Sequence, residues 1–398
     1  KRYALHYILE DRVLEGMLAW SVESTTPDGL KSILSGPTDL PSRISLPDSS
    51  PITISVVADM DISDNSMPTV DRLNGFDGKT VDFNVHLGDF AYEVESDNGM
   101  RGDKFFTALT QSMTNIPYIV TPGNHESFDD FKLFNYRFQM PNTVNGRNDY
   151  YDFLYRGVYF ISINYDYFMK GPPERIVEVQ SWMISRLELM KTLPKDKIKW
   201  KVFFTHRPIY CNDFDYSYDC KVNHLKLNFF HEILQKYSFD LALSSHIHFY
   251  SRLKPIFLQN LHKFDKNGKN AKNNVHDSAN QGYLNIITGQ NGREVPEELL
   301  EDREQYHYPF VVYSNPNNEA YLSVVFHEDR ISGELIDCED REILDRWDIT
   351  NSKVTKGKSS FWPIAIIIIL IFLCTLAIYL YRSHFQSISS NQIPEQNY

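Results

Sequence analysis

The feature that most constrains the fold is a short run of β-branched and other apolar residues followed by a turn that carries Asp, Asn or His. The arrangement occurs five times, as Ile52–Val57 before Asp59, Val81–Leu87 before Asp89, Ile116–Thr121 before Asn124, Ile198–Thr205 before His206 and Phe239–Leu243 before His246. Segments with helical periodicity lie between several of these runs, at Phe105–Met113, Gln180–Leu193 and Leu225–Tyr237. This alternation predicts an α/β domain whose ligand site lies in the loops at the carboxyl ends of its strands.

The regions on either side of this alternation have different patterns. After it we expect only strands, at Tyr283–Thr288, Phe310–Tyr313, Tyr321–His327 and Ile331–Ile336. Before it, a strand is expected around Met17–Ser24, and a connection rich in Gly, Pro, Ser and Asp follows from Ser35 to Pro51. Residues 1–50 are therefore predicted to form a short N-terminal β segment and linker.

Composition limits the class of protein without identifying it. The 398 residues are enough for two or three domains, and 42% hydrophobic with 23% charged residues excludes a mostly disordered chain. Four cysteines exclude a small disulfide-stapled domain. The net charge of −12 argues against nucleic acid as a partner bound through a broad basic surface. An anionic substrate would need a local positive charge, such as a metal ion.

An apolar run without charged residues extends from Phe361 to Tyr381. A helix of this length spans a bilayer core of about 30 Å, and Trp362 and Tyr379 near its ends suit the two interfaces. A buried core helix is the alternative, but soluble cores rarely hold so long an apolar run. We therefore predict a single transmembrane helix at 361–381, between a juxtamembrane linker at 349–360 and a short cytosolic tail at 382–398.

The orientation of this helix rests on two observations that disagree. Lys353, Lys356 and Lys358 precede the run and Arg382 follows it, so the local charge does not favour an N-terminal region outside the cytosol. The chain begins at Lys1 instead of Met, as after removal of a signal peptide or in a fragment. We favour a single-pass type I membrane protein whose main domain is luminal or extracellular, in the secretory or lysosomal pathway or at the cell surface.

The turn residues after the strands form a chemically consistent set. Each alone is weak evidence, but together Asp59, Asp89, Asn124 and the histidines supply hard oxygen donors and imidazoles, which suit iron, zinc or manganese. His246 and His248 are two residues apart, so on an extended segment both project to the same side. The sequence therefore predicts a metal site.

Five short motifs resemble those of the calcineurin-like metallophosphoesterases and, within them, the purple acid phosphatases. They are Asp59-Met60-Asp61, Gly88-Asp89-Phe90-Ala91-Tyr92, Gly123-Asn124-His125-Glu126, Val202–Pro208 and His246-Ile247-His248. The resemblance extends through Asp348 and implies a β-sandwich flanked by helices, of mixed α/β (α+β) class, as a catalytic domain at 51–348. The first fifty residues are too short for the full β domain that precedes it in high-mass members.

The resemblance also implies a dinuclear centre and a reaction. Fe(III) would be held by Asp59, Asp89, Tyr92 and His248, and a divalent iron, zinc or manganese ion by Asp89, Asn124, His206 and His246, with Asp89 bridging the two. Such a centre generates hydroxide that attacks a phosphomonoester. His125 would contact the phosphate or protonate the leaving alkoxide. The implied protein is a membrane-anchored acid phosphatase.

Some residues depart from the family pattern. Asp61 and Ser245 stand where most members have Gly, and Asp61 is either an added ligand, an acceptor bonded to a ligand, or a turn residue that points away. The substrate-pocket histidines that follow the His206 segment in the family have no clear match. His224 is a candidate acid by position alone, with an ordinary surface histidine as the alternative. Cys211 and Cys220 resemble a loop disulfide of some acid phosphatases.

Two other functions stay open at this stage. One is a metallophosphodiesterase that acts on nucleotides or lipids, although the Tyr of the Gly88–Tyr92 motif favours the phosphomonoesterase. The other is a catalytically impaired homologue that acts as a surface receptor or adhesion module. The departures at Asp61 and Ser245 leave room for it, and the presence of all seven expected ligands argues against it.

Overall fold

The computed structural model describes residues 17–25, 31–39, 49–76, 78–194, 196–210, 224–253, 275–292, 311–315 and 319–351, together with four positions between 373 and 378. The chain divides into two compact units, residues 1–350 and 351–398. The first unit contains the sheets and helices described below.

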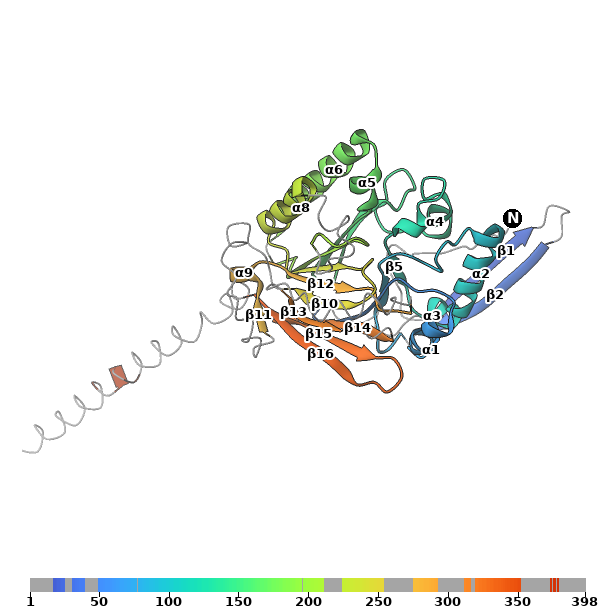
Figure 1. Cartoon of the computed structure of the whole chain (residues 1–398). Coiled ribbons are helices and arrows are strands. Elements are labelled where there is room, and N and C mark those ends of the chain that lie inside the picture. The colour runs from blue at the N-terminus through green and yellow to red at the C-terminus, as the bar shows by residue number, and fades with distance from the viewer. Residues whose placement is uncertain are drawn as a thin grey trace, which may run out of the picture. The chain divides into compact units, whose positions relative to one another are not determined.

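Two seven-stranded sheets form the framework of the described part of this unit (Figure 1). The first has the order β13 (Val311–Asn315), β10 (Tyr250–Leu253), β12 (Leu284–Thr288), β9 (Leu241–Ser244), β8 (Trp200–Phe204), β7 (Val158–Ile163) and β6 (Tyr150–Tyr155). The second has the order β11 (Val275–Asp277), β16 (Ile343–Thr350), β15 (Arg330–Asp337), β14 (Ala320–Phe326), β3 (Ile52–Val57), β4 (Phe83–His86) and β5 (Tyr118–Val120). The strands β3, β4 and β5 run parallel, as do β7, β8, β9 and β12.

The two sheets pack face to face because alternate strand residues are apolar. Ile54 and Val56 of β3 share one buried core with Phe160 of β7 and Val202 of β8. The intervening residues of the first sheet point the other way, where Ile161 lies in a second core. Side chains at i and i+2 of a strand lie on the same face, so both faces of this sheet are buried.

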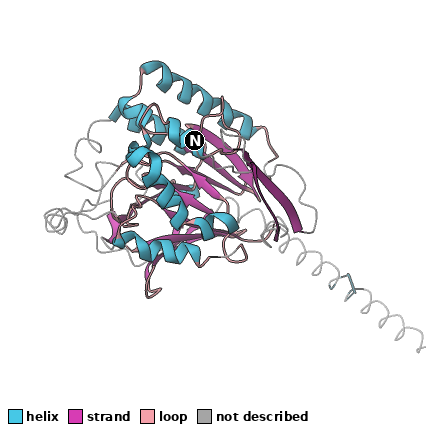
Figure 2. Ribbon diagram, turned by 90° about the vertical axis from the view of Figure 1, so that its right-hand side faces the viewer, coloured by secondary structure: helices cyan, strands magenta, loops and turns pink. Residues whose placement is uncertain are grey.

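Helices cover the outer faces of the sandwich, as Figures 1 and 2 show. α6 (Pro173–Lys191) and α8 (His224–Lys236) pack on the first sheet through residues such as Met183 and Phe230. α1 (Met67–Asn74), α2 (Met100–Ala108) and α3 (Thr110–Asn115) lie against the second, where Asn84 Nδ2 donates to Ser112 Oγ at 3.1 Å. The predicted β-sandwich flanked by helices, of mixed α/β class, is therefore confirmed. The remaining short α-helices among the described residues are α4 (Lys132–Arg137), α5 (Asp166–Lys170) and α9 (Ser278–Gln281).

Several predicted boundaries were wrong. The single helix expected at Phe105–Met113 is two helices, α2 and α3, which meet at Leu109. α6 begins at Pro173, seven residues before the expected start, because proline is accommodated in the first turn of a helix. At the N-terminus, the connection expected from Ser35 is instead β2 (Lys31–Asp39), which pairs antiparallel with β1 (Met17–Thr25). A strand of a two-stranded hairpin has a free edge, and such a strand tolerates the proline at position 37.

Other predictions fall outside the described residues. They are the Cys211–Cys220 disulfide, the side chain of His224, the linker after Asn351, the tail at 382–398 and most of the run at 361–381. Among the residues that are described, we find no helix with the length and apolar character needed to cross a membrane.

Candidate metal centre

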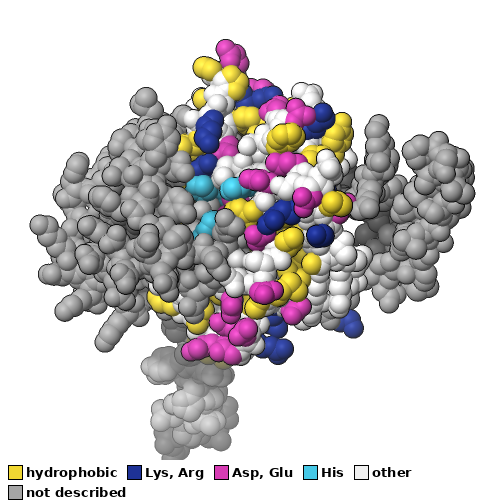
Figure 3. All heavy atoms as spheres, turned by 45° about the vertical axis from the view of Figure 1, so that its right-hand side comes forward, with side chains coloured by type: hydrophobic (Ala, Val, Ile, Leu, Met, Phe, Trp, Pro, Cys, Tyr) yellow, Lys and Arg dark blue, Asp and Glu magenta, His cyan; other side chains and the backbone are white. Residues whose placement is uncertain are grey.

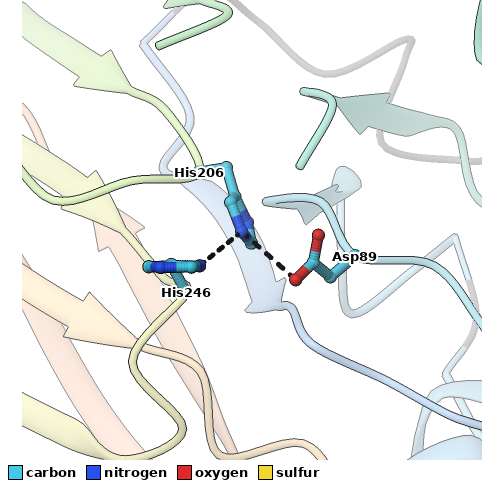
Figure 4. A group of neighbouring side chains, drawn as sticks. All are labelled: Asp89, His206 and His246. Atoms are coloured by element: carbon cyan, nitrogen blue, oxygen red, sulfur yellow. Dashed lines mark hydrogen bonds and ion pairs between the residues drawn. The ribbon is translucent and has the colours of Figure 1, made fainter. Parts of the chain in front are cut away.

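Side chains from both sheets meet at one edge of the sandwich, where the parallel strands end. Asp59, Asp89 and Asn124 follow β3, β4 and β5 of the second sheet, whereas His206 and His246 follow β8 and β9 of the first. Figure 4 shows the side chains of Asp89, His206 and His246 turned toward one another from three different loops. The carboxyl ends of parallel strands are where folds of this kind place ligands.

Two glycines of the motifs let these loops approach closely. A Cβ atom on Gly123 would lie 2.1 Å from Asp89 Oδ1, and one on Gly88 would lie 2.5 Å from the nitrogen of Gly123. Gly88 also has a φ of +100°, which residues with a side chain rarely adopt. Gly88 and Gly123 are therefore required because the neighbouring loop leaves no room for a side chain.

Four of the predicted ligands form one group around the imidazole of His206. Its Nε2 lies 3.3 Å from Asp89 Oδ2, 3.1 Å from Asn124 Oδ1 and 3.2 Å from His246 Nδ1. The other ring nitrogen, Nδ1, lies 2.8 Å from the carbonyl oxygen of Leu87, which accepts its proton. This contact fixes the ring so that Nε2 faces the other three donors.

The other three predicted ligands form a second group. The hydroxyl of Tyr92 lies 2.8 Å from His248 Nε2 and 3.4 Å from Asp59 Oδ1. His248 Nε2 and Asp59 Oδ1 are 3.8 Å apart. The two groups touch, because Asp59 Oδ2 accepts the backbone N–H of His246 at 3.0 Å.

The separations between donor atoms suit bound metal ions. Ligands about 2.1 Å from one ion lie about 3.0 Å apart in octahedral and about 3.4 Å apart in tetrahedral geometry. The distances from His206 Nε2 to its three neighbours fall in this interval, as does the 3.4 Å separation of the Tyr92 hydroxyl and Asp59 Oδ1. The other two separations of the second group, 2.8 Å and 3.8 Å, lie outside it. The buried Asp59, Asp89, Tyr92, His206 and His246 and the half-buried Asn124 and His248 are also donors of the chemical type that iron, zinc and manganese take.

The electrostatics of the centre show that it attracts positive charge. Burial raises the pKa of Asp59 well above its usual range, and the charge of Asp89 adds to this. Burial alone would lower the pKa of His206. The carboxylates of Asp89 and Asp59 outweigh this effect and raise that pKa to about 9. A protonated imidazole thus partly compensates buried carboxylates that a cation would compensate more fully.

His125 is more accessible than the buried ligands beside it. Its side chain is 33% exposed, and its Nε2 lies 3.9 Å from Asp89 Oδ2. Its Nδ1 lies 3.5 Å from Glu93 Oε1, and its ring meets that of Tyr92 edge to face, with centroids 4.7 Å apart. Histidine side chains gather at one place on the surface in Figure 3. His125 therefore combines a partly exposed ring with a position beside the buried Asp89 carboxylate.

Sequence reasoning missed two residues that support the centre. Glu126 is buried and its carboxylate accepts backbone N–H groups from Asp89, Phe90 and Gly123 at 2.7–2.9 Å. Arg207 Nη1 lies 2.8 Å from His246 Nε2, while its Nε pairs with Asp166. The sequence contained a signal for both, because each directly follows a predicted site residue in one of the motifs. Glu126 follows His125, and Arg207 follows His206.

The two departures from the family pattern both have clear surroundings. The hydroxyl of Ser245 donates to the Leu87 carbonyl at 3.0 Å, beside His206 Nδ1. The carboxylate of Asp61 pairs with Arg101, and among the described residues the group of close carboxylate and imidazole donors is Asp89, His206 and His246. The geometry therefore argues against Asp61 as an added metal ligand.

Comparison with known proteins finds one family. The family model described as calcineurin-like phosphoesterase matches residues 53–250. Acid phosphatase type 7 of Mus musculus is 31% identical over 228 residues, which cover 54% of this chain and 48% of that protein. Purple acid phosphatase 21 of Arabidopsis thaliana is 27% identical over 223 residues, which cover 53% of this chain and 47% of that protein. The chain thus spans about half the length of these curated relatives.

A solved structure has the same fold. The purple acid phosphatase PPD1 from yellow lupin (Lupinus luteus) superimposes with a TM-score of 0.62 at 16% sequence identity, over 84% of this chain and 60% of that one. At this identity the likeness concerns the fold alone.

Proposed function

Residues 53–250 belong to the calcineurin-like phosphoesterase family and the chain is purple acid phosphatase-like, and on this premise we propose that the protein is an acid phosphatase that hydrolyses phosphomonoesters. The observation that carries the proposal is the convergence of seven donor side chains at one edge of the sandwich, in two adjoining groups whose donor atoms lie 2.8–3.8 Å apart.

The proposed assignment of ligands follows the two groups. Asp59, Tyr92 and His248 would hold Fe(III), and Asn124, His206 and His246 a divalent iron, zinc or manganese ion. Asp89 would be the shared ligand, and its carboxylate is held by the backbone N–H of His125 at 3.0 Å. When bound, the two ions would neutralise phosphate oxygens and lower the pKa of a water molecule.

The chain's own residues would supply orientation and a proton. Glu126 holds the peptide groups on both sides of Asp89 and the N–H of Gly123, so the ligands do not have to reorganise when a substrate arrives. His125 is accessible and lies beside the donors, so it is placed to donate a proton to the leaving oxygen. The centre also explains how an acidic chain would bind an anion, since its buried carboxylates favour cations there.

Turnover and metal content together test the proposal. We expect the purified protein to bind iron and a divalent metal, to show visible absorption from a tyrosinate–iron charge transfer, and to cleave 4-nitrophenyl phosphate at pH ~5. His206→Gln should lose metal and activity. His231→Gln is the matched control, because His231 is also buried but bonds to Tyr283 and Gln235 away from the centre.

Other results would select a rival function. Preferential cleavage of bis(4-nitrophenyl) phosphate would favour the phosphodiesterase. Tight metal binding without turnover of either ester would favour the receptor or adhesion module. A protein that binds no iron, zinc or manganese would refute the dinuclear centre.

We also propose that residues 361–381 anchor the protein in a membrane, with the catalytic domain luminal or extracellular and a Cys211–Cys220 disulfide formed there. The support is the uncharged apolar run and the cysteine spacing. Fractionation of cells that express the full chain and a version ending at Ser352 tests the anchor, which predicts membrane and soluble fractions respectively. Thiol labelling before and after reduction tests the disulfide.

A further inference from the structure

We propose that the Asp61–Arg101 ion pair is a positioning device, which holds the strained turn at Ala91–Glu93 and thereby places the Tyr92 phenol against Asp59 and His248. The inference rests on the proposed function, since it concerns how one proposed metal ligand is held. It assigns a role to Asp61, the residue that stands where most members of the family have Gly.

The turn that carries Tyr92 needs support from outside. Ala91, Tyr92 and Glu93 have φ values of 58°, 46° and 82°, which places three consecutive residues with side chains in the left-handed region. Residues with a Cβ atom avoid this region, and successive occurrences are rare. The segment therefore keeps this shape only if surrounding contacts hold it.

Two contacts hold the peptide groups on either side of Ala91. Its N–H donates to the carbonyl oxygen of Met60 at 2.8 Å, and its carbonyl oxygen accepts from Arg101 Nε at 2.5 Å. The first contact comes from the loop after β3 and the second from the first turn of α2. Ala91 is thus fixed between two elements, immediately before Tyr92.

Asp61 completes the arrangement by holding Arg101. The Nη2 of Arg101 pairs with Asp61 Oδ1, and the side chains are 31% and 9% exposed. The backbone N–H of Asp61 donates to Ser66 Oγ at 3.1 Å, which anchors the loop. Because a guanidinium donates from Nε and Nη2 in fixed directions, Arg101 bonds the turn and the carboxylate at the same time. An ammonium group at this position is a single point charge and does not reproduce the fork.

Amide exchange on the metal-free protein tests whether the pair holds the turn. In Arg101→Lys and in Asp61→Asn we expect peptides that cover residues 88–95 to exchange about tenfold faster than in the wild type. The matched control is Arg186→Lys, since Arg186 also pairs with an aspartate, Asp152, here through its Nε at 2.9–3.0 Å, and has a similar exposure of 33%. The control should leave exchange at 88–95 unchanged. Wild-type exchange in both test variants would overturn the inference.

The iron-loaded protein tests whether the pair positions Tyr92. At equal iron content we expect Arg101→Lys and Asp61→Asn to shift or weaken the tyrosinate–iron absorption band, and Arg186→Lys to preserve it. Faster exchange with an unaltered band per iron would overturn the positioning of Tyr92. A wild-type protein that takes up no iron would instead refute the proposed function, and the exchange measurement would still decide whether the pair holds the turn.

Discussion

Replacing Gly123 by Ala tests how much of the site depends on close packing between its loops. Gly123 has φ −97° and ψ −175°, a conformation that alanine adopts without strain. The added Cβ would nevertheless lie 2.1 Å from Asp89 Oδ1 and 2.6 Å from the backbone nitrogen of Asp89, where ordinary contact begins at 3.4 Å. The effect of this substitution is therefore purely one of space.

The magnitude follows from what has to move. Rotation of the Asp89 carboxylate does not relieve the contact with its backbone nitrogen, and that N–H is already held by Glu126 at 2.9 Å. The two loops must therefore separate by about 1 Å, and a displacement of that size at a reacting centre costs about 10²-fold in rate. Overpacking of this kind also lowers the free energy of unfolding by about 1–3 kcal/mol.

The assay compares Gly123→Ala with a glycine that has room for a methyl group. Gly75→Ala is the control, since its Cβ would lie 3.4 Å from the carbonyl oxygen of Arg72 and 3.5 Å from that of Asp71. Turnover of 4-nitrophenyl phosphate, bound metal and urea denaturation are measured for both. Gly123→Ala with wild-type turnover and metal content would refute the reasoning that the motif glycines are required by space.

Three further predictions concern charge, metal and pH. Asp345→Ala should lower the free energy of unfolding, measured by urea denaturation, by about 3–5 kcal/mol, because it removes the carboxylate that bonds Nε and Nη2 of the buried Arg252. Lys132→Ala, which breaks an exposed ion pair, is the control and should change it by less than about 1 kcal/mol. Removal of metal by a chelator should lower the free energy of unfolding of the metal-loaded protein, by about 2.7 kcal/mol if the metal was present at 100 times its dissociation constant. The same chelator should not change the free energy of unfolding of an Asp89→Asn variant that binds no metal. Burial lowers the pKa of His231 to about 4, so its neutral form stabilises the fold above pH 6.5 and this contribution is lost as the pH falls from 6.5 to 4; the urea midpoint of His231→Gln should vary less over that interval.

Much of the fold was predictable where local pattern and buried packing agree. The run Ile52–Val57 is β3 to the residue, because both faces of this strand are covered and its residues are almost all buried. The turn residues after the strands were predictable for a related reason. A polar residue after a buried strand stands at the one edge where parallel strands end together, so Asp59, Asp89 and His206 converge.

Elements that depend on tertiary pairing were not predictable in this way. The hairpin of β6 and β7 was missed because its first strand mixes Tyr, Asp and Leu, and its burial comes from two sides, with Tyr151 in the core between the sheets and Asp152 paired with Arg186 of α6. The role of Asp61 was left open for the same reason. Its partner Arg101 lies 40 residues away on a helix, and no local pattern connects them.

The charge of the centre links its support to its function. Glu126 is buried with a pKa raised to about 8 by burial and by the charge of Asp89, yet it accepts three backbone N–H groups as a carboxylate would. Burying several acidic groups at one edge of the sandwich is unfavourable for a chain without cations. The fold thus concentrates its backbone strain and a negative charge that histidine compensates only in part at the place where the proposed cations would bind. Metal binding would then stabilise the same loops whose geometry it uses for catalysis, which ties the stability of the loaded protein to its activity.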